Sequence, residues 1–440
     1  MYFLIETKEQ LDRFFRDEGS ECYLQFIVNN NETHPALQSI CALYIYSFSK
    51  EKGFIINVNH PEAFELEVPL SHLQSYTNIF VRDKVSALLH LNLPYTDIQS
   101  AHYLATNKPL EPQPKTGAHT FFERKYNVNN VNKIIPIAKH YEVLTAEFES
   151  LYPTILNYKE TKATKWYNEV FTPTLSKMVS EGFKINDTFK KYFEIDEKFN
   201  IKDNKIYGWY NYCTTTGRPT NNFNGISFSA LKHDNGERGS FEANNDTLIE
   251  MDFEGYHPRI IAHLIGYEID RNESIHTQLA KMYFETEEVD DEMYKKSKEL
   301  TFRQMYGGID KKYYKYEFFA KTKNFIDVLW QEFNTKGYVE TVIAKRRLLK
   351  DNYNNITPQK LFNYYIQAFE TEYNIELISK VYTILDKRKS TMILYVYDSM
   401  LFDFSLEDGK ETLQSLITTI SSDFPIKLKR GSTYSSLKAL

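Results

Sequence analysis

Two aspartates in distant, apolar stretches of the chain are the residues best suited to chemistry. Asp252 lies in TLIEMDFEGYHPRIIAHLIG (247–266), where a strand-like run leads into residues with helical spacing. Asp398 interrupts TMILYVYDSMLFDF (391–404), whose two apolar runs predict a β-hairpin turning at 397–399. Singly, each is explained as well by a helix cap or a polar turn. Together, two carboxylates could hold two magnesium ions, or manganese in their place, for phosphoryl-transfer chemistry.

A third segment, DDEMYKKSKELTFRQMYGG (290–308), places a cation and two aromatic rings on one face of a predicted helix. Lys298, Phe302 and Tyr306 recur every four residues, and the acidic residues that open the segment favour a helix N-terminus. A face of this kind suits a triphosphate and a base. The structural alternative is a half-buried amphipathic helix whose lysine reaches to solvent.

Composition limits the class of protein. The chain has 440 residues, enough for two or three domains, and 42% hydrophobic with 25% charged residues excludes a disordered or fibrous chain. A net charge of −6 argues against binding nucleic acid by global charge, although a local basic groove is compatible with it. The 15% aromatic share reflects either an AT-rich genome or a surface that stacks bases.

Other patterns exclude further classes. The three cysteines show no CxxC spacing, which argues against a disulfide framework and a zinc knuckle. Neither a signal peptide nor an apolar run of membrane-spanning length is recognisable, so we expect a cytoplasmic protein with no membrane partner.

The elements that must position these residues divide the chain into stretches. Residues 1–110 contain the runs CYLQFIVN, ICALYIYSF and KGFIINV between polar loops, which predicts strands. The proline-containing stretch 107–117 predicts a linker, and 130–181 predicts helices that end near Gly182. The remainder alternates helices with a few strands.

In order and spacing, the motifs resemble those of the family A DNA polymerases, which include bacterial DNA polymerase I and phage replicases. DFEGYHPRIIAHL is similar to motif A, KELTFRQMYGG to motif B of the fingers, and YVYDSMLFDF to motif C. TTTGRP, ERGSF, GYVETVIAKRRL and FNYYIQAFETE resemble further family segments in the same order. GFKIN and FPIKLKRGSTYSS are similar to its opening segment and closing strand, so the resemblance extends over 137–440.

The resemblance implies a template-directed DNA polymerase that adds deoxynucleoside triphosphates to a primer 3′ end by two-metal nucleotidyl transfer. Asp252 and Asp398 would hold the metals, and Lys298 would act with them in catalysis. The implied nucleotide-binding residues are Arg238, Lys298, Phe302, Tyr306, His257 and Phe253. The implied DNA-binding residues are Arg218, Asn363 and Gln367. The expected duplex-binding cluster, from its positive charge, is Lys345, Arg346, Arg347 and Lys350. Primer–template DNA is the implied partner, and phage replication with a processivity factor or another replisome protein is the implied setting.

The implied fold is α/β and multidomain, with a ribonuclease-H-like domain of exonuclease type before a right-hand polymerase of palm, fingers and much reduced thumb. The expected parts are an exonuclease-like domain (1–135), connecting helices with the reduced thumb (136–213), palm (214–264), fingers (265–350) and palm again (351–440).

The reduced thumb follows from the short distance between GFKIN and TTTGRP. Residues 187–213 offer one helix of about three turns in DTFKKYFEIDEKF and a hairpin turning at Asp203-Asn204. These cannot form two long antiparallel helices around a duplex. We therefore expect distributive synthesis, unless helices from 140–181 act as the thumb.

Two departures concern the choice of sugar. Motif A of the family carries a glutamate five residues after its aspartate, as a steric gate against ribose, whereas this chain has His257. Motif C reads Tyr397-Asp398-Ser399 in place of His-Asp-Glu, and single-subunit RNA polymerases carry a serine at that third place. A ribonucleotide-tolerant or primer-making polymerase is therefore one alternative, and a catalytically silent replication scaffold is another.

A third departure lies in motif B, which usually begins with an arginine twelve residues before its tyrosine. Tyr294 occupies that position, and Lys295 and Lys296 are the neighbouring sources of positive charge.

The N-terminal region departs most. A proofreading 3′–5′ exonuclease needs an Asp-x-Glu pair on its first strand, but YLQFIVNN (23–30) has no acid. Asp83 and Glu142 match the remaining acidic positions loosely, and YTDIQSAHYLA resembles a structural segment of that domain through Asp97. The sequence predicts a domain that keeps its shape and does not proofread.

Overall fold

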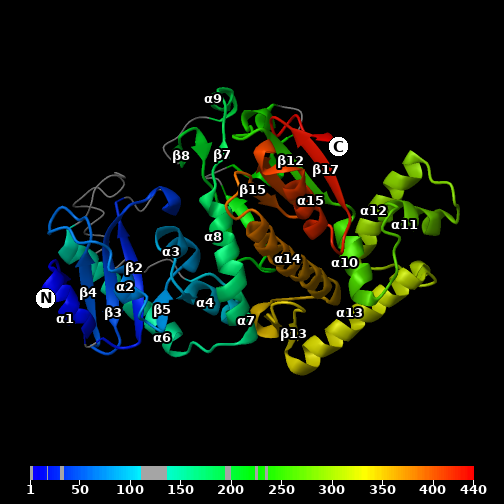
Figure 1. Ribbon diagram of the computed structural model, residues 1–440. Helices are drawn as coiled ribbons and strands as arrows, with labels where there is room; N and C mark the ends of the chain where they lie inside the picture. The colour runs from blue at the N-terminus through cyan, green and yellow to red at the C-terminus, as the bar shows by residue number, and fades with distance from the viewer. Residues whose placement is uncertain are drawn as a thin grey trace. The chain divides into compact units, whose positions relative to one another are not determined.

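The chain forms two compact units in a computed structural model (Figure 1). One unit comprises 1–180 with 207–209, and the other comprises 181–206 with 210–440. No helix in the described ranges is both long and apolar enough to cross a membrane. The described residues are 3–16, 18–29, 34–110, 136–193, 200–222, 226–232 and 236–440. The predicted linker 107–117 lies mostly outside them.

The first unit is built on a six-stranded mixed sheet in the order β1-β4-β3-β2-β5-β6. Neighbouring strands in β4-β3-β2 pair antiparallel, whereas β5 joins β2, β6 joins β5 and β1 joins β4 in parallel. The three β-rich runs of the sequence are β2, β3 and β4, so that prediction is confirmed. The strands are β1 (Leu4–Ile5), β2 (Glu21–Val28), β3 (Ile40–Ser47), β4 (Lys52–Asn57), β5 (Asn78–Val81) and β6 (Tyr95–Asp97).

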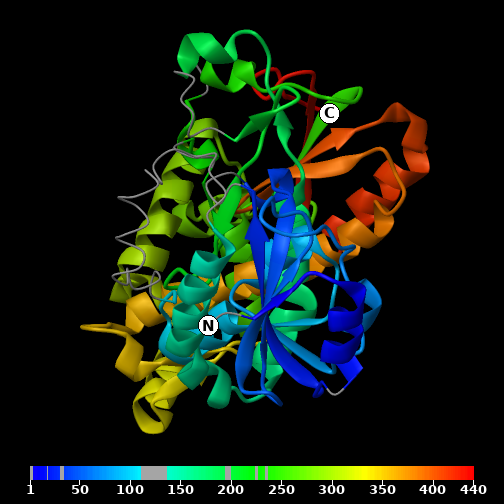
Figure 2. The ribbon, with the colours of Figure 1, turned by 90° about the vertical axis from the view of Figure 1, so that its left-hand side faces the viewer.

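Both faces of this sheet are buried (Figure 2). In β2, Cys22 and Leu24 join one apolar cluster, whereas Tyr23 and Ile27 join the other. Helices α1, α2 and α3 contribute to the first cluster, and α4 and α6 to the second. Burial on both faces explains why these strands are apolar almost throughout. The helices are α1 (Lys8–Arg16), α2 (Leu70–Leu73), α3 (Lys84–His90), α4 (Ile98–Thr106) and α6 (Ile137–Leu156).

The predicted helical region 130–181 continues from α6 to the end of the unit. After α6 come α7 (Lys162–Trp166), a π-helical turn (Tyr167–Phe171) and α8 (Thr172–Ser180). The last helix ends two residues before Gly182, close to the predicted stop.

The second unit is built on a five-stranded antiparallel sheet in the order β15-β16-β12-β17-β18. In the central strand, Asp252 pairs with Ser399 of β16 on one side and with Lys427 of β17 on the other. The hairpin turn is Tyr397-Asp398, one residue shorter than expected, because Ser399 already pairs with Val396. The strands are β12 (Thr247–Phe253), β15 (Thr391–Val396), β16 (Ser399–Phe404), β17 (Ile426–Gly431) and β18 (Lys438–Ala439).

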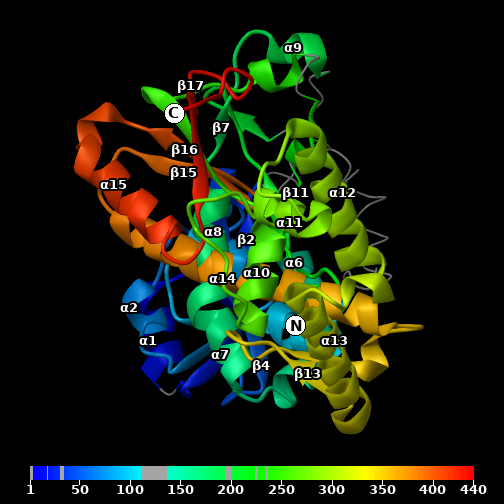
Figure 3. The same ribbon diagram turned by 90° about the vertical axis from the view of Figure 1, so that its right-hand side faces the viewer.

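Six helices of this unit pack against one another in a chain of contacts. The helices α11 and α12 pack side by side (Figure 3), α13 contacts α10 and α14, and α14 contacts α10, α12 and α15. The predicted helix 290–308 is α12, and Asp290 caps it by accepting a hydrogen bond of 2.7 Å from the Met293 amide. The helices are α10 (Tyr256–Ile265), α11 (Ile275–Phe284), α12 (Asp291–Gly307), α13 (Glu317–Lys336), α14 (Pro358–Ile384) and α15 (Gly409–Ile420).

Small elements fill the segment between α8 and β12. The predicted hairpin turns at Asp203-Asn204, whose φ angles of 52° and 57° are left-handed, as a two-residue turn of this kind needs. The predicted helix of three turns is described only as α9, and its continuation at 194–199 lies outside the described residues. The elements are β7 (Phe183–Lys184), α9 (Phe189–Tyr192), β8 (Ile201–Lys202), β9 (Lys205–Ile206), β10 (Trp209–Asn211) and β11 (Thr220–Asn222). A further hairpin joins β13 (Tyr338–Glu340) to β14 (Arg347–Leu349).

Two glycines cap the helix that follows the Asp252 strand, and they differ in their surroundings. Gly255 and Gly266 flank α10 with φ angles of 55° and 60°. A Cβ at Gly255 would overlap with Cγ2 of Ile275 in α11, whereas a Cβ at Gly266 would meet nothing within 4 Å.

We therefore expect unequal costs from the same substitution. Gly266→Ala should lower the free energy of unfolding by about 1–2 kcal/mol, because an L-residue is strained at this φ. Gly255→Ala should cost at least about 1 kcal/mol more, because α11 must also move. Urea unfolding of both variants measures the difference, and equal costs would contradict the packing described for α10 and α11.

Candidate active site

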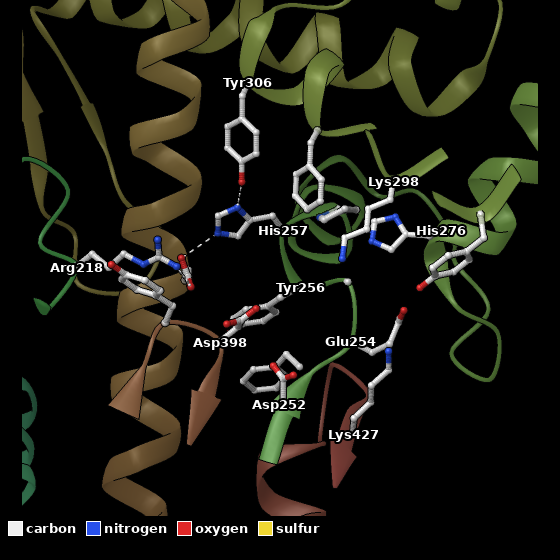
Figure 4. A pocket seen from close by; sticks show the side chains of 17 residues that line it. Arg218, Asp252, Glu254, Tyr256, His257, His276, Lys298, Tyr306, Asp398 and Lys427 are labelled. Carbon is white, nitrogen blue, oxygen red and sulfur yellow. Dashed lines mark hydrogen bonds and ion pairs between the residues drawn. The ribbon is translucent and has the colours of Figure 1, made fainter. Parts of the chain in front are cut away.

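A cavity of about 380 Å³ in the second unit lies around the end of β12 (Figure 4). It is formed by elements far apart in the sequence: the loop before β11, the β12–α10 junction, α11, α12, α14, the β15–β16 turn and β17. Its volume is typical of small-molecule sites, which range over roughly 300–1,000 Å³. The sequence-predicted residues that line it are Arg218, Asp252, Phe253, His257, Lys298, Phe302, Tyr306 and Asp398.

The two aspartates come together at the floor of the cavity. The amide of Phe253 donates to the carbonyl of Asp398 at 3.0 Å, which joins the end of β12 to the β15–β16 turn. Burial raises the pKa of Asp252 to about 6, and the negative charge of Asp398 adds to the increase. Burial also raises the pKa of Asp398, with the charge of Glu370 as the next cause. The carboxylates therefore repel each other in a partly dry site.

Positive charge from β17 offsets part of this repulsion. The Nζ of Lys429 lies 3.8 Å from Oδ2 of Asp252 and also pairs with Glu250. Lys427, the register partner of Asp252, lines the same cavity. A lysine shared between two acids neutralises Asp252 only partly, so the aspartate pair retains affinity for a further cation.

The donor set fits magnesium. Mg²⁺ is usually bound through one or two carboxylates together with substrate phosphates and water. Asp252 and Asp398 supply two such carboxylates in a cavity that also carries cations for phosphate. Across the described ranges, no three His, Cys, Asp or Glu side chains cluster tightly enough to hold a metal alone. A metal here would therefore complete its coordination with water or with a bound phosphate.

One face of α12 forms the opposite wall. Tyr294, Lys298, Phe302 and Tyr306 follow one another at four-residue steps, and all four line the cavity. The rings of Phe302 and Tyr306 are parallel within 9°, with centroids 5.9 Å apart. The adjoining face of the helix packs inside the protein through Ser297, Thr301, Gln304 and Met305. The helix is thus half buried, and its exposed face presents one cation and three rings to the cavity.

His257 is the centre of a hydrogen-bonded network at the back of the cavity. Its Nε2 lies 2.9 Å from Oε2 of Glu370, and its Nδ1 is hydrogen-bonded to the Tyr306 hydroxyl. Arg218 donates to the other carboxylate oxygen of Glu370 at 2.7 Å and lies 3.8 Å above the ring of Tyr397. Burial tends to raise the pKa of Glu370, but His257 and Arg218 hold it below its usual value.

The predicted DNA-binding residues lie outside the cavity, except Arg218. Asn363 and Gln367 are half-buried on α14, on the helix face that also carries Glu370. Lys345 is half-buried and Arg347 is exposed in the β13–β14 hairpin, where Arg347 lies over the ring of Tyr338.

Arg346 corrects the prediction for this cluster. Its side chain is only 2% exposed and donates to the carbonyl of Thr215 at 3.2 Å. A duplex cannot reach it, so it supports the loop that carries Arg218 rather than contacting DNA. Arg346 lies in the loop just before β14, where its side chain turns inward while the neighbouring Arg347 stays exposed.

Other predicted positions also lie apart from the cavity. Arg238 does not line it, because its guanidinium lies over Tyr434 and donates to the carbonyl of Leu231 at 3.1 Å. Lys295 and Lys296 are exposed on α12 and do not line the cavity either.

The cavity also contains residues that the sequence reasoning missed: Glu254, Tyr256, His276, Glu370 and Lys427. A signal existed for Glu370, which follows Gln367 by three residues on one helix face, and for Lys427, which alternates with apolar residues in IKLKRG. His276 left no signal. Its Nδ1 has no hydrogen-bond partner in the described part of the chain, and burial lowers its pKa to about 4.

Comparisons with known proteins find DNA polymerases. No protein-family model matches the chain. It is 25% identical over 267 residues to DNA polymerase I of Borreliella burgdorferi, and 24% identical over 218 residues to the thermostable DNA polymerase I of Thermus filiformis. These matches cover 53% and 42% of this chain but only 29% and 26% of the relatives, so the chain spans less than a third of their length.

A solved structure is similar over nearly the whole chain. The polymerase domain of Pol1 from M. smegmatis, in complex with DNA primer–template and dNTP, matches with a TM-score of 0.70 at 14% identity. The match covers 95% of this chain and 96% of that one. The fold is therefore the mixed α/β fold of a polymerase domain, and the resemblance to DNA polymerase I is confirmed.

Proposed function

We propose that the chain is a template-directed DNA polymerase that adds deoxynucleoside triphosphates to a primer 3′ end. One observation carries the proposal: a paired Asp252 and Asp398 face a helix that presents Lys298, Phe302 and Tyr306 across one cavity. Carboxylates for metal, a cation for phosphate and rings for a base are the parts that nucleotidyl transfer requires. The similarity to DNA polymerase I supports the same reaction.

The acidic and basic residues of the cavity would have different roles. Asp252 and Asp398 would hold two Mg²⁺ ions, which polarise phosphate and lower the pKa of the primer hydroxyl when bound. Lys298 and Lys427 would pair with triphosphate oxygens, and a cation on each side would align the α-phosphate with the primer end. Phe302 and Tyr306 would stack near the new base pair.

Contacts with primer–template DNA would come from outside the cavity. Asn363 and Gln367 present amides that can donate to base edges in the minor groove, where acceptors dominate. Lys345 and Arg347 would contact phosphates, so DNA affinity should fall with salt. Arg218, held by Glu370 and stacked on Tyr397, would lie near the primer end.

The first unit supports the proposal of an exonuclease-like domain that does not proofread. An antiparallel β4-β3-β2 meander followed by parallel β5 and β6, with helices on both faces, is compatible with a ribonuclease-H-like fold. Its two candidate acids, Asp83 and Glu142, make contacts of their own. Asp83 and Asp97 accept hydrogen bonds from backbone amides that open α3 and α4. Glu142 is half exposed and pairs with Lys139.

The short segment between α8 and β12 supports a reduced thumb. Its described elements are α9, of four residues, strands of two or three residues, and two 3₁₀ turns of three and four residues. Little of this could enclose a duplex, so the isolated protein would dissociate often. A processivity partner, action in the replication of a phage or similar replicon, and a cytoplasmic location complete the proposal and rest on the motif resemblance.

Primer extension tests the function directly. The wild-type protein should extend a labelled primer by the nucleotides that its template specifies, in Mg²⁺ or Mn²⁺. Asp252→Asn and Asp398→Asn should each slow extension at least about 100-fold, because half of the carboxylate pair is neutralised. The exposed Asp386→Asn, just before β15, is the matched control and should extend normally. Normal extension by Asp398→Asn would refute the two-metal assignment. A wild-type protein that fails to extend the primer would refute the proposed polymerase activity.

A mismatched primer tests proofreading. With Mg²⁺ or Mn²⁺ but no nucleotides and no pyrophosphate, a labelled primer with a mismatched 3′ end should keep its length. Shortening that persists in Asp398→Asn would come from a second site and would contradict the prediction.

Primer extension in the presence of a trap tests the prediction that the reduced thumb makes synthesis distributive. When heparin captures every protein molecule that dissociates, products should be only a few nucleotides longer than the primer. Long products from single binding events, without a partner, would show that other elements enclose the duplex.

A further inference from the structure

Both ring nitrogens of His257 are already engaged before any ligand binds. Because the carboxylate of Glu370 can only accept a hydrogen bond, Nε2 of His257 must carry a proton and donate it. The remaining nitrogen, Nδ1, is engaged with the Tyr306 hydroxyl in either protonation state of the ring, as acceptor when neutral and as donor when protonated. The ring can therefore offer only its C–H edges to the cavity.

The position of His257 places those edges near the sugar of a bound nucleotide. A triphosphate would lie between the aspartate pair and Lys298, while a base would stack against the rings of α12. The sugar connects the two. Figure 4 shows His257 below Tyr306 and above Asp398, which is the intervening position along this path.

We infer that Glu370 is a positioning residue for sugar selection, because it occupies Nε2 of His257 and so denies a ribose 2′-hydroxyl the imidazole as a hydrogen-bond partner. The inference rests on the proposed function and deepens it. A deoxyribose has no hydroxyl to satisfy at this place, whereas a 2′-hydroxyl would lose its water without gaining an imidazole nitrogen in exchange. This mechanism differs from steric exclusion of the 2′-hydroxyl. It depends on the hydrogen bond between His257 and Glu370, not on the size of the imidazole.

Glu370 can hold this role because it is rigid and charged. Its side chain is fully buried, and it is hydrogen-bonded to His257 and ion-paired to Arg218 at the same time. Both carboxylate oxygens are thereby used, so the group cannot turn away from His257 without leaving Arg218 unpaired. Removing it frees the imidazole to rotate and to present a nitrogen to the cavity.

The sugar preference of two substitutions tests the inference. We expect the ratio of kcat/KM for dATP to kcat/KM for ATP, on one primer–template, to fall about tenfold in Glu370→Ala. In this variant a ribose hydroxyl gains the freed imidazole nitrogen of His257 as a hydrogen-bond partner. Glu370→Gln should keep a ratio within about threefold of wild type, because its amide oxygen still accepts from Nε2. Its turnover should drop alike for both nucleotides, since Arg218 loses its counter-charge.

A matched control separates this role from a loss of packing. Glu372→Ala removes another fully buried glutamate of α14, one that accepts from the amides of Ile343 and Ala344 outside the cavity. It should weaken the fold as much as Glu370→Ala and leave the sugar ratio unchanged. Equal ratios in wild type and Glu370→Ala, or an equal fall in Glu372→Ala, would overturn the inference.

Binding without turnover distinguishes this inference from the proposed function. Affinities for dATP and ATP are measured in calcium, with a primer that ends in a dideoxynucleotide. A wild-type protein that prefers dATP and loses this preference in Glu370→Ala supports the inference, even if extension fails and the polymerase proposal falls. A wild-type protein that extends primers but shows no deoxy preference in either assay overturns the inference alone.

Discussion

Negative charge concentrated at one end of a buried antiparallel sheet is the constraint on which the second unit depends. Asp252 lies near the end of β12, and Asp398 lies in the turn that leads into the neighbouring strand β16. Burial raises the pKa of both aspartates, and the charge of Glu370 raises the pKa of Asp398 further. Like charges in a partly dry site must be neutralised. Lys429 from β17 and Arg218 from the loop before β11 do this in part. The same cations attach those elements to the site, so the electrostatics and the shape of the cavity are established together.

The sequence predicted the parts of this site whose signals are local. An apolar run ending at Asp252 and leading into helical spacing predicts a strand-to-helix junction, and two apolar runs around Asp398 predict a hairpin. A four-residue repeat predicts the face of α12 that carries Lys298. These patterns need only the period of one element, which is why β12, the hairpin and α12 were found with nearly correct bounds.

Residues whose roles depend on distant partners were not predictable in this way. Nothing near Glu370 in the sequence indicates that Arg218 and His257 will meet it, because both partners are more than a hundred residues away. Arg346 was assigned to DNA on its charge, and only the packing of its hairpin shows that it is buried. Arg238 was placed with the phosphates by resemblance, but it lies over Tyr434. In each case the missing information is tertiary.

We propose that metal ions arriving with the nucleotide complete the aspartate pair. Counting bound Mn²⁺ by electron paramagnetic resonance tests this most directly, with a dideoxy-terminated primer–template and the matching dNTP present. The account predicts about two tightly bound ions per wild-type protein, and fewer when dNTP is omitted or Asp252 is replaced by asparagine. Two ions bound equally well by Asp252→Asn and Asp398→Asn would contradict it.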